Sequence, residues 1–203
     1  MKVIGLTGGI GTGKSTAAEY LLAHGMVHVD ADQIAREITY KGSPLISTLN
    51  GAFGHEGEFG RPDNCIITAD GELDRKALAG VAFASEEAHK RLNDIMYGAI
   101  ISEIKMQIEC HRSSTLDVLL DVPQLFESGT DSLCNKIIVL YADMDVRISR
   151  VCARDGVKPE DVEARISNQM SPEEMKKRAD FVVDNSGTVE ELHAQLDRII
   201  PEL

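Results

Sequence analysis

Long apolar segments and clustered cysteines are both missing from this chain of 203 residues. The apolar runs are short, so none predicts a membrane-spanning helix, and no signal region precedes the first predicted strand. The cysteines are far apart, and no pair has the spacing of a metal site or a redox motif: Cys65, Cys110, Cys134 and Cys152. We therefore expect reduced, structural thiols in a cytoplasmic protein.

Basic residues are also scarce, with 21 Lys and Arg against 33 Asp and Glu and a formal net charge of −12. This balance argues against nucleic acid as the main partner, because phosphate backbones attract basic surfaces. An acidic chain that binds an anionic ligand must gather its few cations at the binding site. The length is sufficient for one sizeable α/β core.

A phosphate-binding motif stands near the start of the chain. It is a Gly, four free residues and then Gly-Lys-Ser, here Gly8-Gly9-Ile10-Gly11-Thr12-Gly13-Lys14-Ser15. Glycines let backbone N–H groups approach a triphosphate closely and allow turns with φ > 0. Lys14 supplies a mobile charge for the β- and γ-phosphates, and the Ser15 hydroxyl is a ligand for Mg²⁺.

The flanks of this motif have the pattern that it requires. Residues 2–7 are typical of a short buried strand, and Ala17, Ala18, Leu21 and Leu22 mark one face of a helix whose N-terminal dipole would face the anion. A glycine-rich turn with an accidental Lys-Ser is the alternative. The strand and helix on either side favour the phosphate loop.

A second strand is predicted over residues 26–29, followed by Asp30-Ala31-Asp32 at its carboxyl end. Ligands bind at that edge of open α/β sheets. Arg36 stands one helical turn after Asp32. Spacing alone leaves two roles open for the aspartates, which are catalysis and the capping of a helix.

Residues 41–112 are predicted to be a helical insertion. The polar segment 55–71 is interpreted as a loop or hairpin, and it includes Arg61-Pro62-Asp63-Asn64. A capping signal at Ser85 precedes a long helix with a one-sided apolar stripe. The stripe consists of Leu92, Ile95, Met96, Ala99, Ile100, Ile104 and Ile108.

The α/β pattern resumes with an apolar run that ends at Asp121. An aspartate there is typical of a Walker B strand, where it lies beside Mg²⁺, although buried strands also end in Asp at ordinary turns. A helix over 145–154 carries Arg147, Arg150 and Arg154, and a charged segment over 157–178 contains Arg165. These arginines indicate either a phosphate-clamping lid or solvated helix faces.

The element order predicts an α/β fold with a parallel sheet flanked by helices. We expect a single unit over 1–203. Its nucleotide-binding core takes 1–40, 113–150 and 179–203, its insertion 41–112 and its lid 151–178.

An ordered set of motifs closely resembles the dephospho-CoA kinase family over nearly the whole chain. The set comprises Gly5 to Thr16, Asp30-Ala31-Asp32-Gln33-Ile34-Ala35-Arg36, Gly71-Glu72-Leu73-Asp74-Arg75, Asp121-Val122-Pro123-Gln124-Leu125-Phe126-Glu127, Arg154-Asp155-Gly156, Ala164-Arg165-Ile166 with Gln169-Met170, and Ala179 to Gly187. The resemblance implies a P-loop kinase that transfers the ATP γ-phosphoryl to the ribose 3′-hydroxyl of dephospho-CoA. We expect a cytoplasmic monomer without a membrane or nucleic-acid partner.

The resemblance also implies roles for individual residues. Asp32 is the base, and Lys14 and Arg154 complete the catalytic group. ATP would contact Gly9, Ile10, Gly11, Thr12, Gly13, Lys14, Ser15, Thr16, Arg150, Asn185 and Gly187. The acceptor would contact Asp32, Arg36, Arg75 and Arg165, and Mg²⁺ would contact Ser15 and Asp121.

The sequence departs from the family pattern in three places. In the long helix, Tyr97-Gly98 stands where the family usually has His-Pro, and Ile101 stands where it often has Arg. The segment 55–71 is longer than usual. Gln124 replaces a common Leu. Rival functions are another small-molecule P-loop kinase, a nucleotide-dependent switch protein and a CoA-sensing module without turnover. A GTPase would need Asn-Lys-x-Asp, but Asn135-Lys136 is followed by Ile138 at the Asp position.

Overall fold

The computed structural model describes residues 1–60 and 65–203, so the predicted loop residues 61–64 lie outside the described part. The chain divides into two compact units. The first comprises Met1–Asp30 and Ile108–Leu203, and the second comprises Ala31–Gln107. The second unit thus begins ten residues before the insertion boundary expected from the sequence.

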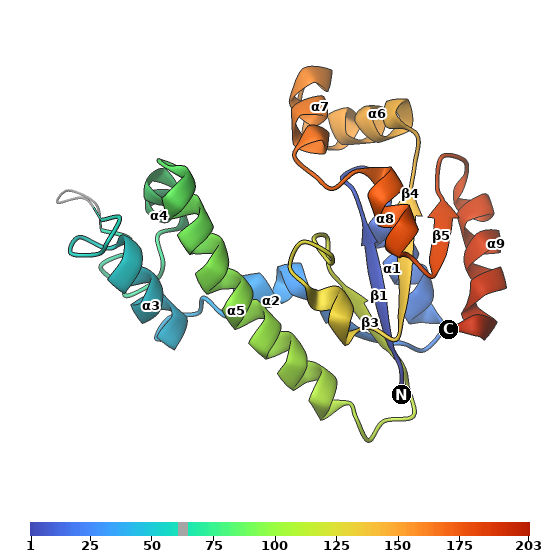
Figure 1. The fold of residues 1–203 in the computed structure, drawn as a ribbon, viewed down its shortest axis with the longest axis horizontal. Helices are drawn as coiled ribbons and strands as arrows, with labels where there is room; N and C mark the ends of the chain where they lie inside the picture. The colour runs from blue at the N-terminus through green and yellow to red at the C-terminus, as the bar shows by residue number, and fades with distance from the viewer. Residues whose placement is uncertain (61–64) are drawn as a thin grey trace. The chain divides into compact units, whose positions relative to one another are not determined.

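A parallel sheet forms the centre of the first unit (Figure 1). Its strands are β1 (Val3–Gly8), β2 (Val27–Asp30), β3 (Val118–Asp121), β4 (Lys136–Tyr141) and β5 (Phe181–Asp184), and they lie in the order β2-β3-β1-β4-β5. Every pairing in this sheet is parallel. The predicted fold class is therefore confirmed, and the carboxyl ends of the strands meet at one edge.

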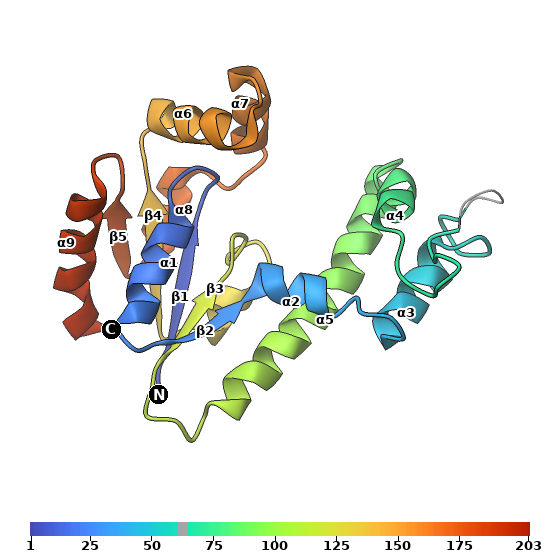
Figure 2. The same cartoon turned by 180° about the vertical axis from the view of Figure 1, so that it is seen from behind.

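Helices cover both faces of this sheet. Helices α1 (Lys14–Ala23) and α9 (Val189–Ile199) lie on one face, while α8 (Pro172–Arg178) and the 3₁₀ turn η1 (Thr130–Leu133) lie on the other (Figures 1 and 2). On the α1 and α9 face, the apolar side chains of both helices pack with those of the strands in one buried cluster. A second 3₁₀ turn, η2 (Ile200–Glu202), follows α9.

The region expected to be the lid, 151–178, contains α7 (Pro159–Ser167), α8 and the end of α6 (Met144–Asp155), which begins in the expected core. Helices α6 and α7 pack on each other through Val151, Val162 and Ile166. Ile10 of the phosphate loop packs against the same cluster. Helices α6 and α7 therefore share an apolar core with the loop.

The second unit is helical, with α2 (Ala31–Glu37), α3 (Pro44–Phe53), α4 (Arg75–Ala82) and most of α5 (Glu86–Cys110). Side-chain caps start three of these helices: Ser43, Asp74 and Ser85 accept hydrogen bonds from backbone N–H groups of α3, α4 and α5. The first half of the predicted stripe packs on the core of this unit through Leu92, Ile95, Met96 and Ala99. An isolated antiparallel bridge joins Ile67 to Leu73, so the described end of the predicted loop or hairpin is a tight hairpin-like turn. No helix in the described residues is both long and apolar enough to cross a membrane.

Candidate active site

The phosphate loop connects β1 to α1, and its glycines are required by both its turns and its neighbours. Gly11 and Gly13 have φ values of 79° and 84°, in the left-handed region that side chains rarely adopt. A Cβ on Gly9 would lie 2.5 Å from Nη2 of Arg147, and one on Gly13 would lie 2.2 Å from Nδ2 of Asn185. Only glycines allow these groups to pack directly behind the loop, which leaves a backbone-lined cradle of the kind that binds phosphate.

Hydrogen bonds hold this loop in shape from several sides. The Thr12 hydroxyl donates to the Gly9 carbonyl over 2.8 Å, and the buried Asn185 amide donates to the Thr12 carbonyl over 2.8 Å. Arg150 in turn donates to the carbonyls of Asn185 and Gly187 over 2.8 and 3.4 Å. The structure thus gathers Arg150, Asn185 and Gly187 beside the loop, and their contact with ATP stays a prediction.

Opposite charges meet where the central strands end. The sheet register pairs Asp121 with both Leu6 and Asp30, which places the aspartate beside the start of the phosphate loop. The Lys14 ammonium forms an ion pair with Oδ1 of Asp121, and Nε2 of His28 lies 3.6 Å from Oδ2. The Asp121 side chain is 7% exposed and that of Lys14 is 19% exposed. A nearly buried carboxylate and a mobile cation therefore stand together at the loop.

The donors at this edge fit a magnesium ion that is delivered with a nucleotide. Ser15, in the first turn of α1, is exposed and offers a hydroxyl, and Asp121 offers a carboxylate. Mg²⁺ prefers oxygen ligands and usually keeps several waters, with one or two protein ligands plus substrate phosphates. Within residues 1–60 and 65–203, no group of three or more His, Cys, Asp or Glu side chains could hold a metal alone. This ligand set suits a phosphate-bound ion.

The lid arginines share one carboxylate. Arg154 donates to both oxygens of Asp155, over 2.7 Å from Nε and 3.0 Å from Nη2, and Nη1 of Arg165 lies 3.5 Å from the same carboxylate. The hydrogen bonds from Arg154 hold the pKa of Asp155 below its usual value. Both guanidiniums remain largely exposed, at 64% and 50%. Two predicted phosphate contacts are therefore held together and open to solvent.

Three of the four predicted acceptor-binding residues lie in the second unit, whereas Arg165 stands in α7 of the first. Asp32 is exposed in the first turn of α2, a position where a carboxylate interacts favourably with the helix dipole. Arg75 donates to the Arg36 carbonyl over 3.3 Å and also to the Thr39 hydroxyl. The two arginines are thereby brought together at the end of α2.

The comparison with known proteins decides the family. The sequence model of dephospho-CoA kinase matches residues 2–191. The chain belongs to the dephospho-CoA kinase family. Family members that it resembles include the Corynebacterium glutamicum enzyme, 39% identical over 98% of this chain and 96% of the relative, and the Bacillus licheniformis enzyme, 38% identical over 98% and 94%.

Solved structures agree with this membership. Dephospho-CoA kinase from Campylobacter jejuni has a TM-score of 0.71 at 26% identity and is covered over 96% of its length by 98% of this chain. TT1252 from Thermus thermophilus has a TM-score of 0.78 at 31% identity, with coverage of 100% of this chain and 97% of that protein. Shikimate kinase from Acinetobacter baumannii, at 13% identity and a TM-score of 0.55, shares the fold. The P-loop kinase architecture expected for the family is confirmed.

Three side chains at this site were not among the predicted residues. Arg147 and Gln169 contact the backbone of Ile10, and His28 lies beside Asp121. Arg147 belongs to the arginine cluster of α6, and its spacing within that cluster does not indicate that it is buried, at 4% exposure. Gln169 stands in one of the motifs that resemble the family, but the motif indicates no role for it, and its contact spans 159 positions of the chain.

Proposed function

We propose that this protein transfers the γ-phosphoryl group of ATP to the ribose 3′-hydroxyl of dephospho-CoA, with Mg²⁺ as the metal. Membership of the dephospho-CoA kinase family supports the reaction. We assign the reaction to this site because the glycine loop and the Lys14–Asp121 ion pair stand together at the strand ends. All four cysteines are free, which suits a cytoplasmic location.

In this proposal the phosphate loop and Lys14 hold the triphosphate. Within 9–16, the N–H groups of Ile10 and Thr12 donate to Gln169 and to the Gly9 carbonyl, so the other backbone N–H groups of the loop would bind the phosphates. The N-terminus of α1 adds its dipole. Lys14 exchanges Asp121 for the phosphates, because its flexible stem carries a point charge that follows the nearest anion. Bound Mg²⁺ would neutralise phosphate charge, and Ser15 and Asp121 would hold it.

The arginines contribute charge where the phosphoryl group is transferred. Phosphoryl transfer depends on positioning and electrostatic stabilisation more than on covalent chemistry. Arg154 in α6 and Arg165 in α7 are exposed cations, and they would exchange Asp155 for phosphate oxygens. Arg150 would contact the nucleotide near Asn185 and Gly187, where its guanidinium is already fixed.

The second unit, in this proposal, binds the acceptor. Arg36 and Arg75 would contact phosphates of dephospho-CoA, since both are exposed cations joined at the end of α2. Binding of dephospho-CoA should slow hydrogen exchange within 41–112, whereas an ATP analogue should slow it within 8–16. The reverse pattern of protection would contradict the assignment.

Asp32 would act as the base that orients the 3′-hydroxyl and accepts its proton. General-base groups typically contribute about 10²- to 10⁴-fold to the rate. The Asp32→Asn variant keeps the size of the side chain and its capacity to cap a helix, because Asn and Asp are both favoured caps. We expect kcat to fall by at least about 10²-fold while ATP affinity and Tm change little.

The test is a coupled assay of ADP release, with and without dephospho-CoA. Asp145→Asn is a matched control, because Asp145 is also an exposed aspartate in the first turn of a helix, α6. Full activity of Asp32→Asn, or a large loss of Tm with unchanged turnover, would leave Asp32 as a helix cap. ADP release with a nucleoside monophosphate, shikimate or gluconate in place of dephospho-CoA would favour another small-molecule kinase, and nucleotide binding without turnover would favour a sensing module.

A further inference from the structure

Both backbone polar groups of Ile10, in the middle of the phosphate loop, are bonded to side chains from α6 and from the connection between α7 and α8. The Ile10 N–H donates to Oε1 of Gln169 over 3.0 Å, and the Ile10 carbonyl accepts from Nε of Arg147 over 2.9 Å. Nη2 of Arg147 also donates to Oε1 of Gln169 over 3.4 Å. One amide oxygen and one guanidinium therefore fix the two peptide planes that flank Ile10.

The guanidinium in this arrangement is buried next to the loop. Arg147 is 4% exposed, and burial lowers its pKa from the usual value for arginine. The oxygens that it contacts belong to a carbonyl and an amide, which are neutral groups. A buried charge is costly unless its surroundings compensate for it. The Arg147 guanidinium lies directly behind Gly9, since a Cβ on that glycine would be 2.5 Å from Nη2 of Arg147. The negative charge of a polyphosphate bound at the loop would therefore compensate for the buried positive charge.

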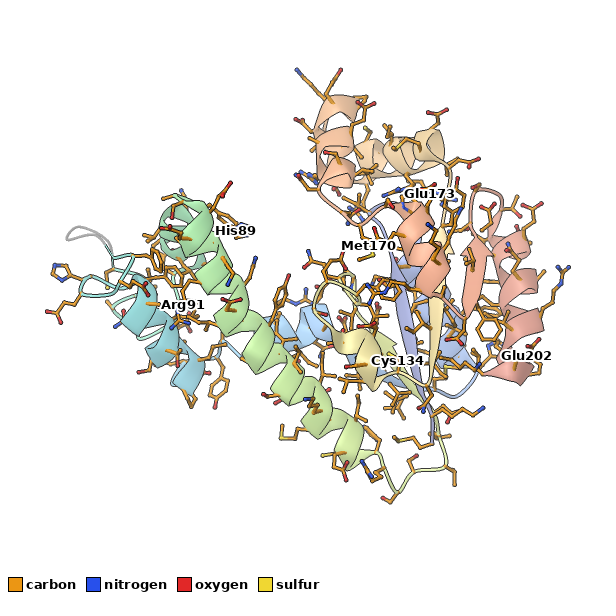
Figure 3. All side chains as sticks on the ribbon, in the orientation of Figure 1. His89, Arg91, Cys134, Met170, Glu173 and Glu202 are labelled. Carbon is orange, nitrogen blue, oxygen red and sulfur yellow. The ribbon has the colours of Figure 1, made fainter. Side chains whose placement is uncertain are left out.

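The side chain of Ile10 is attached to the same region. It packs against the apolar cluster that joins α6 to α7, which contains Val151, Val162 and Ile166. Gln169 stands in the short connection from α7 to α8, next to Met170, which Figure 3 labels. The Met170 N–H donates to Oε1 of Glu127 over 3.4 Å. The connection is therefore held on both sides, by the phosphate loop and by the segment after β3.

We propose that Gln169 and Arg147 form a brace that fixes the Ile10 peptide groups, and that Gln169 is a positioning residue which keeps the phosphate loop in the shape that binds polyphosphate. The inference rests on the proposed function, since it assigns the loop to ATP. A loop that is already formed loses less conformational entropy when the nucleotide binds. The brace therefore raises the affinity of the loop for the phosphates of the ligand and leaves the contacts of the adenosine unchanged.

The first test measures ligand affinity in the Gln169→Leu variant, which keeps the approximate volume and removes the acceptor oxygen. A hydrogen bond between neutral groups corresponds to about a 2- to 12-fold change in affinity. We expect the Kd of Mg-ADP, measured by calorimetry, to rise by about that factor. We also expect adenosine affinity and the KM for dephospho-CoA to stay within about twofold. Ser167→Ala is the control, because its hydroxyl bonds within α7 to Ala164 over 2.9 Å.

The second test reads the brace directly through hydrogen exchange of the Ile10 amide, followed by NMR in the whole chain without ligand. Gln169→Leu should speed this exchange by at least about tenfold, while Gln169→Glu should keep the amide protected because a carboxylate oxygen also accepts. Equal loss of protection in both variants would overturn the proposal, as would an unchanged Mg-ADP affinity in Gln169→Leu. The exchange measurement needs neither turnover nor dephospho-CoA, so it decides on the brace even if the proposed kinase reaction fails.

Discussion

The ion pair between Lys14 and Asp121 makes the phosphate-loop lysine a structural residue, in addition to the catalytic role proposed for it. Replacing Lys14 by Met removes the cation and keeps a long, flexible side chain. The Asp121 carboxylate then remains 7% exposed without the ammonium that it contacts. Removing one partner of a buried pair is destabilising because it leaves a buried charge uncompensated.

The magnitude follows from the burial of the two partners. Removing one partner of a fully buried ion pair lowers the free energy of unfolding by about 3–5 kcal/mol. The Lys14 side chain is 19% exposed, so water reaches the site and the cost is lower. We therefore expect Lys14→Met to lower the free energy of unfolding by about 2 kcal/mol, which is below that range. For a protein of this size, that value corresponds to a fall in Tm of about 4–8 °C.

Thermal denaturation without nucleotide measures this loss, and two further variants control it. Lys136→Met breaks the exposed pair of Lys136 with Asp180, whose side chains are both 39% exposed, so its Tm should change by less than about 2 °C. The double variant Lys14→Met/Asp121→Asn removes both charges and should recover most of the Tm, while kinase activity stays lost. An unchanged Tm in Lys14→Met, or no recovery in the double variant, would refute the reasoning.

Further predictions concern the lid and the packing behind β1. Arg154→Ala should lower kcat/KM for ATP by about 10²-fold, because a donor to the transferring phosphoryl is lost, with no change in Tm; near-natural kinetics would remove Arg154 from the site. Gly5→Ala should cost about 1–3 kcal/mol in thermal unfolding, because its Cβ would lie 2.7 Å from Sγ of Cys134, and Cys134→Ala should restore the loss. Burial raises the pKa of Cys134 to about 12, so its thiol stays protonated at pH 9 and iodoacetamide should modify it far more slowly than the exposed Cys65 until denaturant is added.

The fold was largely predictable because its signals are local. Buried strands in a parallel sheet are continuous apolar runs, and each run ended at a polar or glycine residue that the sequence displays. The capping signal at Ser85 was confirmed by a hydrogen bond from the Ala88 N–H over 3.1 Å. The division between the two units was harder to place. Helix α2 reads as a continuation of the β-α pattern, yet it groups with the helical unit. One of its contacts there, from Arg75 to the Arg36 carbonyl, joins residues that are 39 positions apart.

The site was predictable where a motif prescribes the chemistry and not where packing does. Gly11, Gly13 and Lys14 stand in the loop that the motif describes, and Asp121 lies at the predicted strand end. Arg147 and Gln169 were missed because their contacts with Ile10 join parts of the chain that are 137 and 159 positions apart. A buried arginine has no signature in a single sequence, since its three-residue spacing from Arg150 is also that of a solvated helix face.

The cations at this site fall into two classes, and the distinction bears on how an acidic chain binds ATP. Lys14 is paired with Asp121, and Arg154 is paired with Asp155, so in the proposed reaction phosphate would have to displace an anion from each. That exchange would weaken binding of the ground state, while it would keep both cations in place for the moment at which charge develops. Arg147 instead contacts neutral oxygens. Its charge is therefore not exchanged when a nucleotide binds, and it adds a fixed positive potential behind the loop in a chain whose formal net charge is −12.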